Sequence, residues 1–399
     1  MIPYGRHHID NDDIEAVIAA LKSDSLTGGA WVGQFEEDLA RFTSARNAVV
    51  CNSGTAALHL ALMALDIGAG DVIVVPSLTF LATANAGIYV GADVKFADVD
   101  PETGLLTSET LNAALRELPA ERVKAVLPVH LNGAMSDVRS TSLPSGMGHV
   151  AIVEDACHAI GGTYSGSDIL VGSAPWAAMT CFSFHPVKTI AMGEGGAITT
   201  ESDDLAERLR LLRNHGMERD AARFVMPDQG VDSVGKPFPW FYEMATVGYN
   251  YRASDLHCAL GTSQLKKAPG FLARRRELAC RYNDLIGELA PIVKPVPRSA
   301  PDGDGWHLFS VHIDFHAVGK PREQVMQELR ERGIGSQVHY LPVHRQPFYQ
   351  QKYGKQHLPG ADSYYQKQLS LPLFPAMEDT DVDRVLEALA QVLNLRAVV

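Results

Sequence analysis

The sequence predicts an α/β protein with a mostly parallel central sheet flanked by helices, followed by a smaller C-terminal α/β domain. Short runs rich in Val, Ile and Ala alternate with segments of helical periodicity through the first two-thirds of the 399 residues. These runs are continuously apolar, as expected for strands buried on both faces between layers of helices. We expect a large domain at residues 1–265 and a small domain at residues 266–399 that begins with a linking helix.

Each element of the large domain is predicted from its own pattern. Strands are expected at residues 48–51, 72–75, 94–97, 125–129, 150–153, 179–182 and 197–199. Helices with apolar residues at helical spacing are expected at residues 11–22, 34–43, 55–65, 107–117 and 202–214. This alternation supports the α/β class.

The C-terminal third has fewer and less regular elements. A long helical pattern covers residues 254–289, and we expect it to break near Pro269. Strands are expected at 308–314 and 336–340, and helices at 322–332 and 379–393. These elements suit a small α/β domain.

Composition excludes several classes of function. With 47 acidic and 35 basic residues, the net charge is −12, so there is no positive field to attract nucleic acid or an anionic membrane. The apolar runs are shorter than the ~18 residues that span a bilayer. The five cysteines include no CxxC pair, and no HExxH or similar metal spacing occurs. We therefore expect a cytoplasmic protein without a metal site.

A lone lysine follows the predicted strand at 179–182. Lys188 ends the segment Ser-Phe-His-Pro-Val-Lys, and the stretch Gly-Glu-Gly-Gly at 193–196 leads into the next strand. A lysine amine forms a Schiff base only when it is unprotonated, so such a site must lower its pKa by burial or by a nearby cation. Lys188 is a candidate for this chemistry, but by itself it also fits a surface lysine.

An acidic residue ends the predicted strand at 150–153. Open α/β sheets bind ligands beyond the carboxyl ends of their strands, which is where Asp155 stands. A carboxylate there could pair with a protonated pyridine nitrogen of a cofactor. Asp155 could equally cap the next turn, and the sequence leaves both interpretations open.

Two further segments could contact a planar, phosphate-bearing ligand. Ser53, Gly54 and Thr55 form a polar turn between a strand and a helix, where free amides and the helix dipole suit a phosphate. Phe80 could lie flat on a heterocycle. Alone, the turn also fits a simple helix cap, and Phe80 also fits a core residue.

Together, the turn at 53–55, Phe80, the segment 155–158 and the segment 183–188 resemble the sugar aminotransferases of the DegT/DnrJ/EryC1/StrS family. Their order and spacing match as well. The resemblance covers nearly the whole chain and continues at residues 214–216, 248–252, 337–340 and 370–372. It implies the fold of the PLP-dependent transferases of fold type I, pyridoxal 5'-phosphate (PLP) as the cofactor, and a homodimer with active sites at the subunit interface.

The resemblance also implies a role for each matching residue. Lys188 matches the lysine that holds the cofactor as an imine and shuttles protons, Asp155 the partner of the pyridine nitrogen, and His158 the neighbour of the phenolic oxygen. Phe80 matches the stacking position. The implied phosphate ligands are Ser53, Gly54, Thr55, Ser183 and, from the other subunit, Asn250.

Several segments resemble the branch of the family that acts in pseudaminic acid biosynthesis: residues 2–6, 26–29, 184–188, 240–243 and 338–340. This implies transfer of an amino group, usually from glutamate, to the keto carbon of a UDP-linked 4-keto-6-deoxy-N-acetylhexosamine. The residues expected near this substrate are His185, Arg252, His339 and Tyr340. Further candidates for its diphosphate are Lys266, Lys267, Arg345 and the arginines at 274–276.

Other segments leave alternatives open. Residues 131–135 depart from the usual family pattern, and residues 224–242 are expected to cover the substrate as a loop. Relatives that dehydrate sugars replace the lysine with histidine, so Lys188 argues against that chemistry. A different nucleotide-linked keto sugar and a non-catalytic regulatory scaffold remain alternatives. A nicotinamide enzyme would need a GxGxxG turn, which residues 52–55 do not form.

Overall fold

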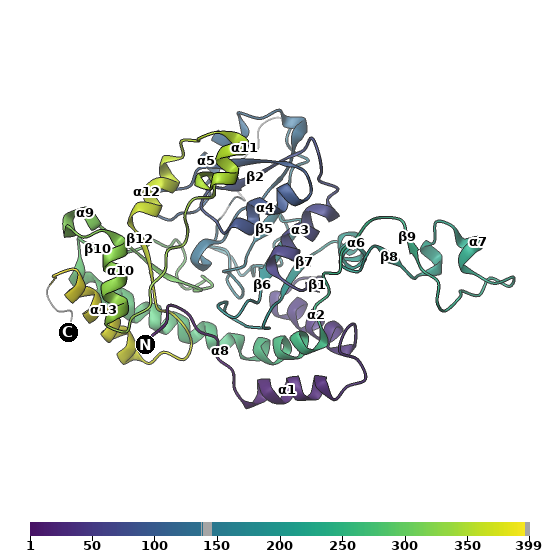
Figure 1. Ribbon diagram of the computed structural model, residues 1–399, viewed down its shortest axis with the longest axis horizontal. Coiled ribbons are helices and arrows are strands. Elements are labelled where there is room, and N and C mark those ends of the chain that lie inside the picture. Colours follow the sequence, from purple (N-terminus) through teal and green to yellow (C-terminus); the bar gives the residue numbers. More distant parts are fainter. Residues whose placement is uncertain (137, 139–145, 396–399) are drawn as a thin grey trace.

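The computed structural model describes residues 1–136, 138 and 146–395. A seven-stranded sheet forms its centre, and Figure 1 shows the small domain at one end of the molecule and a projecting arm at the other. The strands are β1 (Asn47–Cys51), β2 (Val72–Pro76), β3 (Asp93–Ala97), β4 (Val123–Val126), β5 (Ala151–Asp155), β6 (Met179–Ser183) and β7 (Gly196–Thr200). All seven strands predicted for the large domain are present.

The strand order is β1-β7-β6-β5-β4-β2-β3. Neighbouring pairs from β6 to β3 are parallel, while β7 runs antiparallel to both β6 and β1. The mostly parallel sheet predicted from the sequence is therefore confirmed. Since parallel strands end at the same edge, the turns after β2, β4, β5 and β6 lie together.

Helices cover both faces of this sheet. They are α1 (Asn11–Leu21), α2 (Ala30–Thr43), α3 (Gly54–Ala64), α4 (Leu81–Tyr89), α5 (Ser108–Leu115), α6 (Asp203–Arg213) and α8 (Asp255–Ile286), with the short helices η1 (Ala120–Arg122) and η2 (Leu131–Gly133) between them. A hydrophobic core lies on each face of the sheet, and successive residues of β1 point into different cores. Val49 packs with α3, whereas Val50 packs with α2 and the start of α8. This two-sided burial explains why the strands are continuously apolar.

The predicted break near Pro269 is wrong, because helix α8 continues through this proline. A proline inside a helix removes one backbone hydrogen bond and costs about 3 kcal/mol. Leu265, Ala268, Phe271 and Leu272 are buried on both sides of it. Burial of such side chains contributes roughly 1.5–3 kcal/mol each, which outweighs the lost bond.

The chain after α8 packs in two places: its strands and its last helix lie against the second half of α8, whereas Val343 and Tyr349 pack in the core of the large domain. Its strands are β10 (Val293–Pro295), β11 (Phe309–Ile313) and β12 (Gln368–Leu371), and its other elements are η4 (Gly287–Leu289), α9 (Phe315–Val318), α10 (Arg322–Glu331), η5 (Val343–Arg345), α11 (Pro347–Tyr353), α12 (Pro359–Lys367) and α13 (Asp379–Val392). The three strands form an antiparallel sheet. The strand predicted at 336–340 is wrong: Gln337 makes only an isolated bridge to Ser370 of β12, because the amides of Val338 and His339 donate to the side chains of Gln337 and Gln368 instead.

The predicted division at residues 265 and 266 falls inside α8 and remains a prediction. Ile2 packs in the core of the small domain, and its backbone bonds with Gly333 and Gly335. Residues 396–399 of the predicted small domain lie outside the described residues. No described helix is long and apolar enough to cross a membrane.

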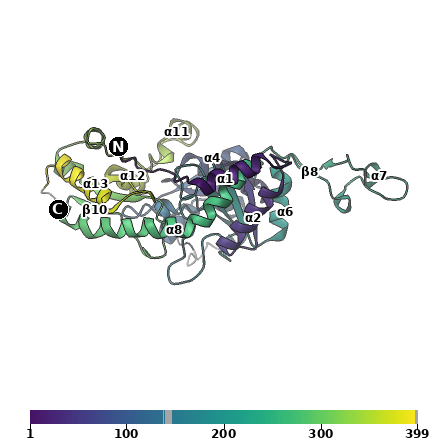
Figure 2. The same cartoon turned by 90° about the horizontal axis from the view of Figure 1, so that it is seen from below.

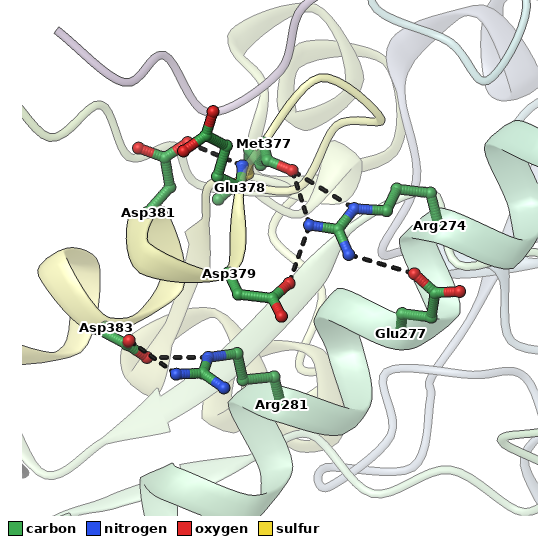
Figure 3. A network of polar contacts seen from close by, with 8 residues as sticks. All are labelled: Arg274, Glu277, Arg281, Met377, Glu378, Asp379, Asp381 and Asp383. Carbon is green, nitrogen blue, oxygen red and sulfur yellow. Dashed lines mark hydrogen bonds and ion pairs between the residues drawn. The ribbon is translucent and has the colours of Figure 1, made fainter.

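An ionic seam joins α8 to the start of α13 (Figure 3). The Arg274 guanidinium donates to the Met377 carbonyl and the Asp379 carboxylate at 2.8 Å each, and Arg281 binds Asp383 with two bonds of 2.8 and 2.6 Å. We call these residues the α8–α13 seam. They attach the last helix of the described chain to the helix that links the domains.

A long arm leaves the large domain after α6. It contains β8 (Met217–Glu218), η3 (Ala221–Arg223), α7 (Pro227–Gly230) and β9 (Glu243–Met244), and Figures 1 and 2 both show it projecting away from the body. Its apolar side chains are exposed: Val225 is 71% exposed, Val234 84% and Trp240 72%. The arm therefore has little core of its own.

Candidate active site

A cavity of about 530 Å³ lies where the carboxyl ends of the parallel strands face residues 337–340 of the small domain. Among the residues proposed from sequence, eleven line it: Ser53, Gly54, Thr55, Phe80, Asp155, His158, Ser183, His185, Lys188, His339 and Tyr340. Five separate stretches of chain contribute these residues. The fold thus brings most of the predicted site into one place.

Lys188 lies in the loop that connects β6 to β7. Its backbone N–H donates to the His185 carbonyl at 2.8 Å, and Phe184 N–H donates to the Gly195 carbonyl at 2.8 Å, so the loop folds back on itself. Removal of water lowers the pKa of the Lys188 amine, while the nearby Cys157 and Asp155 oppose this shift. The structure therefore provides the direction of pKa change that Schiff-base chemistry requires.

Asp155 is the last residue of β5 and is buried beneath the cavity. Its Oδ2 accepts a hydrogen bond of 2.6 Å from Thr83 Oγ1, and Thr83 in turn lies 2.7 Å from Thr79 Oγ1. Its Oδ1 accepts from the Cys157 N–H at 3.2 Å, so Asp155 also caps the following turn. The capping interpretation is therefore confirmed, and a carboxylate has further lone pairs with which it could bind a second partner.

The turn at 53–55 begins helix α3. Ser53 is the N-cap residue, and its Oγ accepts from the Ala56 N–H at 3.1 Å. The amides of Gly54 and Thr55 belong to the first helical turn, which has no intrahelical carbonyl to bind. A Cβ on Gly54 would lie 2.7 Å from Ser183 Cβ, so only glycine lets this helix end approach β6 so closely.

Three histidines and a tyrosine form one wall. His158 Nε2 lies 3.1 Å from the Tyr340 hydroxyl, and the rings of His158 and His307 are 4.5 Å apart. His339 Nδ1 lies 2.8 Å from Ser370 Oγ. Burial, and then the charge of Lys188, lower the pKa of His339 to about 3 and that of His158 well below its usual value. These imidazoles are therefore neutral at physiological pH.

Phe80 is the N-cap residue of α4 and lines the same cavity. It is 56% exposed, and its ring centre lies 5.9 Å from that of Tyr340. A core phenylalanine would be enclosed, so the exposure favours contact with a ligand over a purely structural role.

Two predicted site residues lie elsewhere. Arg252 lines an adjoining open cavity of about 570 Å³, which shares Ser53, Thr55 and Glu194 with the first, and its guanidinium donates to Asn214 Oδ1 at 2.5 Å. Asn250 is exposed and lines neither cavity.

The other candidate cations do not line the main cavity. Lys267 pairs with Asp10 and Asp13, Arg274 belongs to the α8–α13 seam, and Arg345 pairs with Asp362. Arg275 is buried and donates to the carbonyls of His307 and Leu373. Among the described residues, no group of three or more His, Cys, Asp or Glu could hold a metal ion.

Sequence reasoning missed Tyr4 and His307, which line the cavity from the N-terminus and from the small domain. Tyr4 lies in the matching segment 2–6, for which no site role was expected, and His307 lies outside all the matching segments. It also missed Asn132, whose backbone bonds to His158. The sequence could have indicated that Thr79 and Thr83 lie side by side, because a spacing of four residues aligns side chains at the start of a helix.

Comparisons with known proteins agree with this site. The spore coat polysaccharide biosynthesis protein SpsC of Bacillus subtilis is 38% identical over 397 residues, which is 98% of this chain and 97% of that protein. The solved structure of Helicobacter pylori PseC, an aminotransferase involved in the biosynthesis of pseudoaminic acid, gives a TM-score of 0.85 at 28% identity and covers 98% of this chain and 99% of its own.

Two other solved structures show the cofactor and the kind of substrate. The sugar aminotransferase Spr1654 of Streptococcus pneumoniae was solved in PMP and PLP forms; the PMP form gives a TM-score of 0.84 at 27% identity over 99% of both chains. DesI, solved with its TDP-sugar product, gives 0.83 at 28% identity over 98% of this chain and 92% of that chain.

The fold, the cavity and these likenesses together define a PLP-dependent sugar aminotransferase, an enzyme that uses pyridoxal phosphate to transfer an amino group. The chain belongs to the DegT/DnrJ/EryC1/StrS aminotransferase family, whose pattern matches residues 7–390. The residues at the cavity fit the cofactor: a lysine of lowered pKa, a buried carboxylate, an exposed aromatic ring and free helix N-terminal amides.

Proposed function

We propose that this chain transfers an amino group from L-glutamate to the keto carbon of a UDP-linked 4-keto-6-deoxy-N-acetylhexosamine, as in pseudaminic acid biosynthesis. The observation that carries this proposal is the match to PseC over 98% of the chain with a TM-score of 0.85. The segments at 184–188 and 338–340, which resemble that branch in sequence, both line the cavity.

We further propose a role for each residue of the cavity. When bound, pyridoxal phosphate supplies a carbonyl for amine exchange and a ring that accepts electrons from the substrate. Lys188 holds the cofactor covalently and moves the proton in each half of the reaction. Asp155 keeps the pyridine nitrogen protonated, and His158 lies beside the phenolic oxygen.

The remaining residues orient the ligands in this proposal. Phe80 limits the tilt of the cofactor ring, and Ser53, Gly54, Thr55 and Ser183 bind its phosphate. His185, His339 and Tyr340 face the sugar. Arg252 is the candidate for the diphosphate, because its cavity adjoins the turn at 53–55.

A homodimer forms part of the proposal, and the arm supports it. Asn250 lines neither cavity of its own chain, which suits a contact with the cofactor phosphate of a partner subunit. No residue of 224–242 lines the main cavity either, so we propose that this segment covers the site of the partner. Val225, Val234 and Trp240 would be buried in such a dimer, with a gain of about 25 cal/mol per Å² of apolar surface.

Sedimentation tests this assembly. The wild type is expected at twice the 43.3 kDa of one chain, and a Val225→Ser/Trp240→Ser variant should shift toward the monomer. Phe348→Ser is the matched control, because Phe348 is 52% exposed on α11, far from the arm in the sequence. A monomeric wild type would overturn the dimer.

A specific observation favours a second candidate substrate. SpsC, at 38% identity, is a spore coat polysaccharide protein, and DesI carries a TDP-sugar product. A different nucleotide-linked keto sugar is therefore the alternative. A one-residue change in a pocket is enough to redirect specificity without altering the cofactor residues.

An absorption experiment decides between the two. Glutamate should bleach the visible band of the cofactor-loaded protein, and the UDP-linked 4-keto-6-deoxy-N-acetylhexosamine should restore it. Bleaching without restoration by this sugar would favour the alternative substrate, which a TDP-linked 4-keto sugar would then test. Failure of glutamate to bleach the band would reject it as the donor.

We also propose that the enzyme works in the cytoplasm. All five cysteines are free in the structure, as expected in a reducing compartment. Fractionation of the cells that express it, followed by detection with an antibody, would test this location.

A further inference from the structure

His158 is held by two hydrogen bonds that together fix its proton. The backbone N–H of Asn132 donates to Nδ1 at 3.3 Å, and Nε2 lies 3.1 Å from the Tyr340 hydroxyl. A backbone amide can only donate, so Nδ1 must carry no proton. Neutral imidazole has one N–H, and this must therefore be on Nε2, where it points to the oxygen of Tyr340.

This assignment determines where the Tyr340 proton points. The Nε2–H of His158 occupies one lone pair of the Tyr340 oxygen, so the hydroxyl proton cannot also point toward His158. Among the described residues, His158 is the one hydrogen-bond partner of this hydroxyl, and Tyr340 lines the cavity. The O–H is therefore free to donate to a ligand.

We propose that Asn132 is a positioning residue, which holds His158 as the Nε2–H tautomer and thereby makes Tyr340 a hydrogen-bond donor to an oxygen in the cavity. The acceptor is either the phenolic oxygen of the cofactor or the carbonyl oxygen of the keto sugar. This choice of acceptors rests on the proposed function, whereas the tautomer of His158 does not.

The conformation of Asn132 supports a positioning role. Its φ of 62° is left-handed, a region that asparagine adopts more readily than most residues. Its Nδ2 donates to the Tyr364 hydroxyl at 3.0 Å, and its Oδ1 accepts from Ser310 Oγ at 3.2 Å. Its carbonyl accepts from Arg298 at 3.1 Å. Three interactions thus aim one N–H at His158.

The surroundings of His158 agree with a neutral ring. A protonated imidazole would direct an N–H at the amide of Asn132, which is repulsive. Burial, then Lys188 and His339, lower the pKa of His158 well below its usual value. A Cβ on Gly133 would lie 2.8 Å from the His158 carbonyl oxygen, so the segment that contains Asn132 and Gly133 packs tightly against His158.

The test is the ¹⁵N NMR spectrum of the full-length protein with labelled histidine, recorded without cofactor and again with pyridoxal phosphate. The His158 signals, assigned by their loss in His158→Gln, should show a protonated Nε2 and a bare Nδ1 in both samples. Tyr340→Phe should keep this tautomer, because the amide of Asn132 remains. A protonated Nδ1 or a cationic ring would overturn the proposal.

Side-chain variants test the part assigned to Asn132. Asn132→Ala removes two anchors and disfavours the left-handed backbone, so the Nδ1 and Nε2 signals of His158 should move toward each other as the second tautomer appears. Asn85→Ala is the matched control, because Asn85 also binds a tyrosine hydroxyl, that of Tyr349 at 2.7 Å, but does not contact His158. Unchanged His158 signals in Asn132→Ala would reject its positioning role.

Tyr340→Phe distinguishes the two acceptors. Loss of one donor aimed at developing charge typically lowers kcat by about 100-fold or more. If the acceptor is the cofactor, the variant should also weaken binding of pyridoxal phosphate and shift its absorption maximum. If it is the keto sugar, cofactor binding should stay unchanged and only the sugar half-reaction should slow. No change in either quantity would show that Tyr340 donates to neither.

Discussion

The cavity and the α8–α13 seam are both built from charged groups, but they differ in contact with water. At the cavity, buried polar groups donate hydrogen bonds to Asp155, and burial lowers the pKa of Lys188 and His158. At the seam, Asp379 and Glu277 are 59% and 64% exposed in their side chains, and water screens their pairs with Arg274. The same kinds of residue should therefore be worth far more at the cavity.

The largest effect is expected for Lys188→Ala. Under its proposed role, the variant would lose both covalent attachment of the cofactor and proton transfer, and proton transfer alone is worth about 100- to 10,000-fold. Multiple-turnover transamination, measured by release of 2-oxoglutarate, should be abolished. Lys188→Arg is the control that keeps a positive charge. Appreciable turnover in either variant would falsify the assignment of Lys188.

A smaller but still large loss is expected for Asp155→Asn. The amide keeps the shape of the side chain but removes the charge that is proposed to pair with the cofactor. Truncation of one partner of a buried charge pair costs about 2 to 5 kcal/mol. Binding of pyridoxal phosphate, followed by fluorescence, should weaken accordingly. Thr83→Val removes one donor to Asp155 and should cost less, so an equal loss in both variants would argue against a charge effect.

The histidine wall should make the fold sensitive to acid. The folded pKa of His339 is about 3, whereas an unfolded histidine titrates near ~6.5. Below pH ~6.5, His339 binds a proton in the unfolded chain but not in the folded chain. The free energy of unfolding therefore falls as the pH drops toward 3, by up to about 1.4 kcal/mol per pH unit for this residue. Urea unfolding of His339→Gln, repeated across this pH range, should show a free energy of unfolding that falls less steeply with pH than in the wild type. The same dependence on pH in both proteins would mean that His339 is not the group responsible.

The smallest effect is expected at the seam. Arg274→Met keeps most of the apolar stem and removes the ion pairs, which are worth ~0 to 1 kcal/mol at the surface. Thermal unfolding should change little, and the difference from the wild type should shrink in 1 M salt. A loss of several kcal/mol would show that the seam behaves like the buried cavity.

The regular parts of the fold could be predicted from local patterns. The seven strands of the main sheet follow from continuously apolar runs, and α1, α2, α3, α5 and α6 follow from helical periodicity. Helix α4 was not predicted. Local patterns failed where distant packing decided the outcome. Pro269 lies inside an unbroken α8, and Gln337 makes only an isolated bridge to β12 because the next two amides bond to side chains.

The sequence by itself determined the chemistry of this protein: Lys188, Asp155 and the turn at 53–55 carry recognisable types and spacing, and the order of the strands along the chain places each at a strand end. Only the tertiary structure decided how these groups are surrounded. Tyr4 and His307 line the cavity and the Asn132 N–H donates to His158, yet none of the three belongs to a cofactor motif. Their contacts exist only once distant segments of the chain pack together. Residue type sets what a group can do, but the local dielectric and the available partners decide whether it does so.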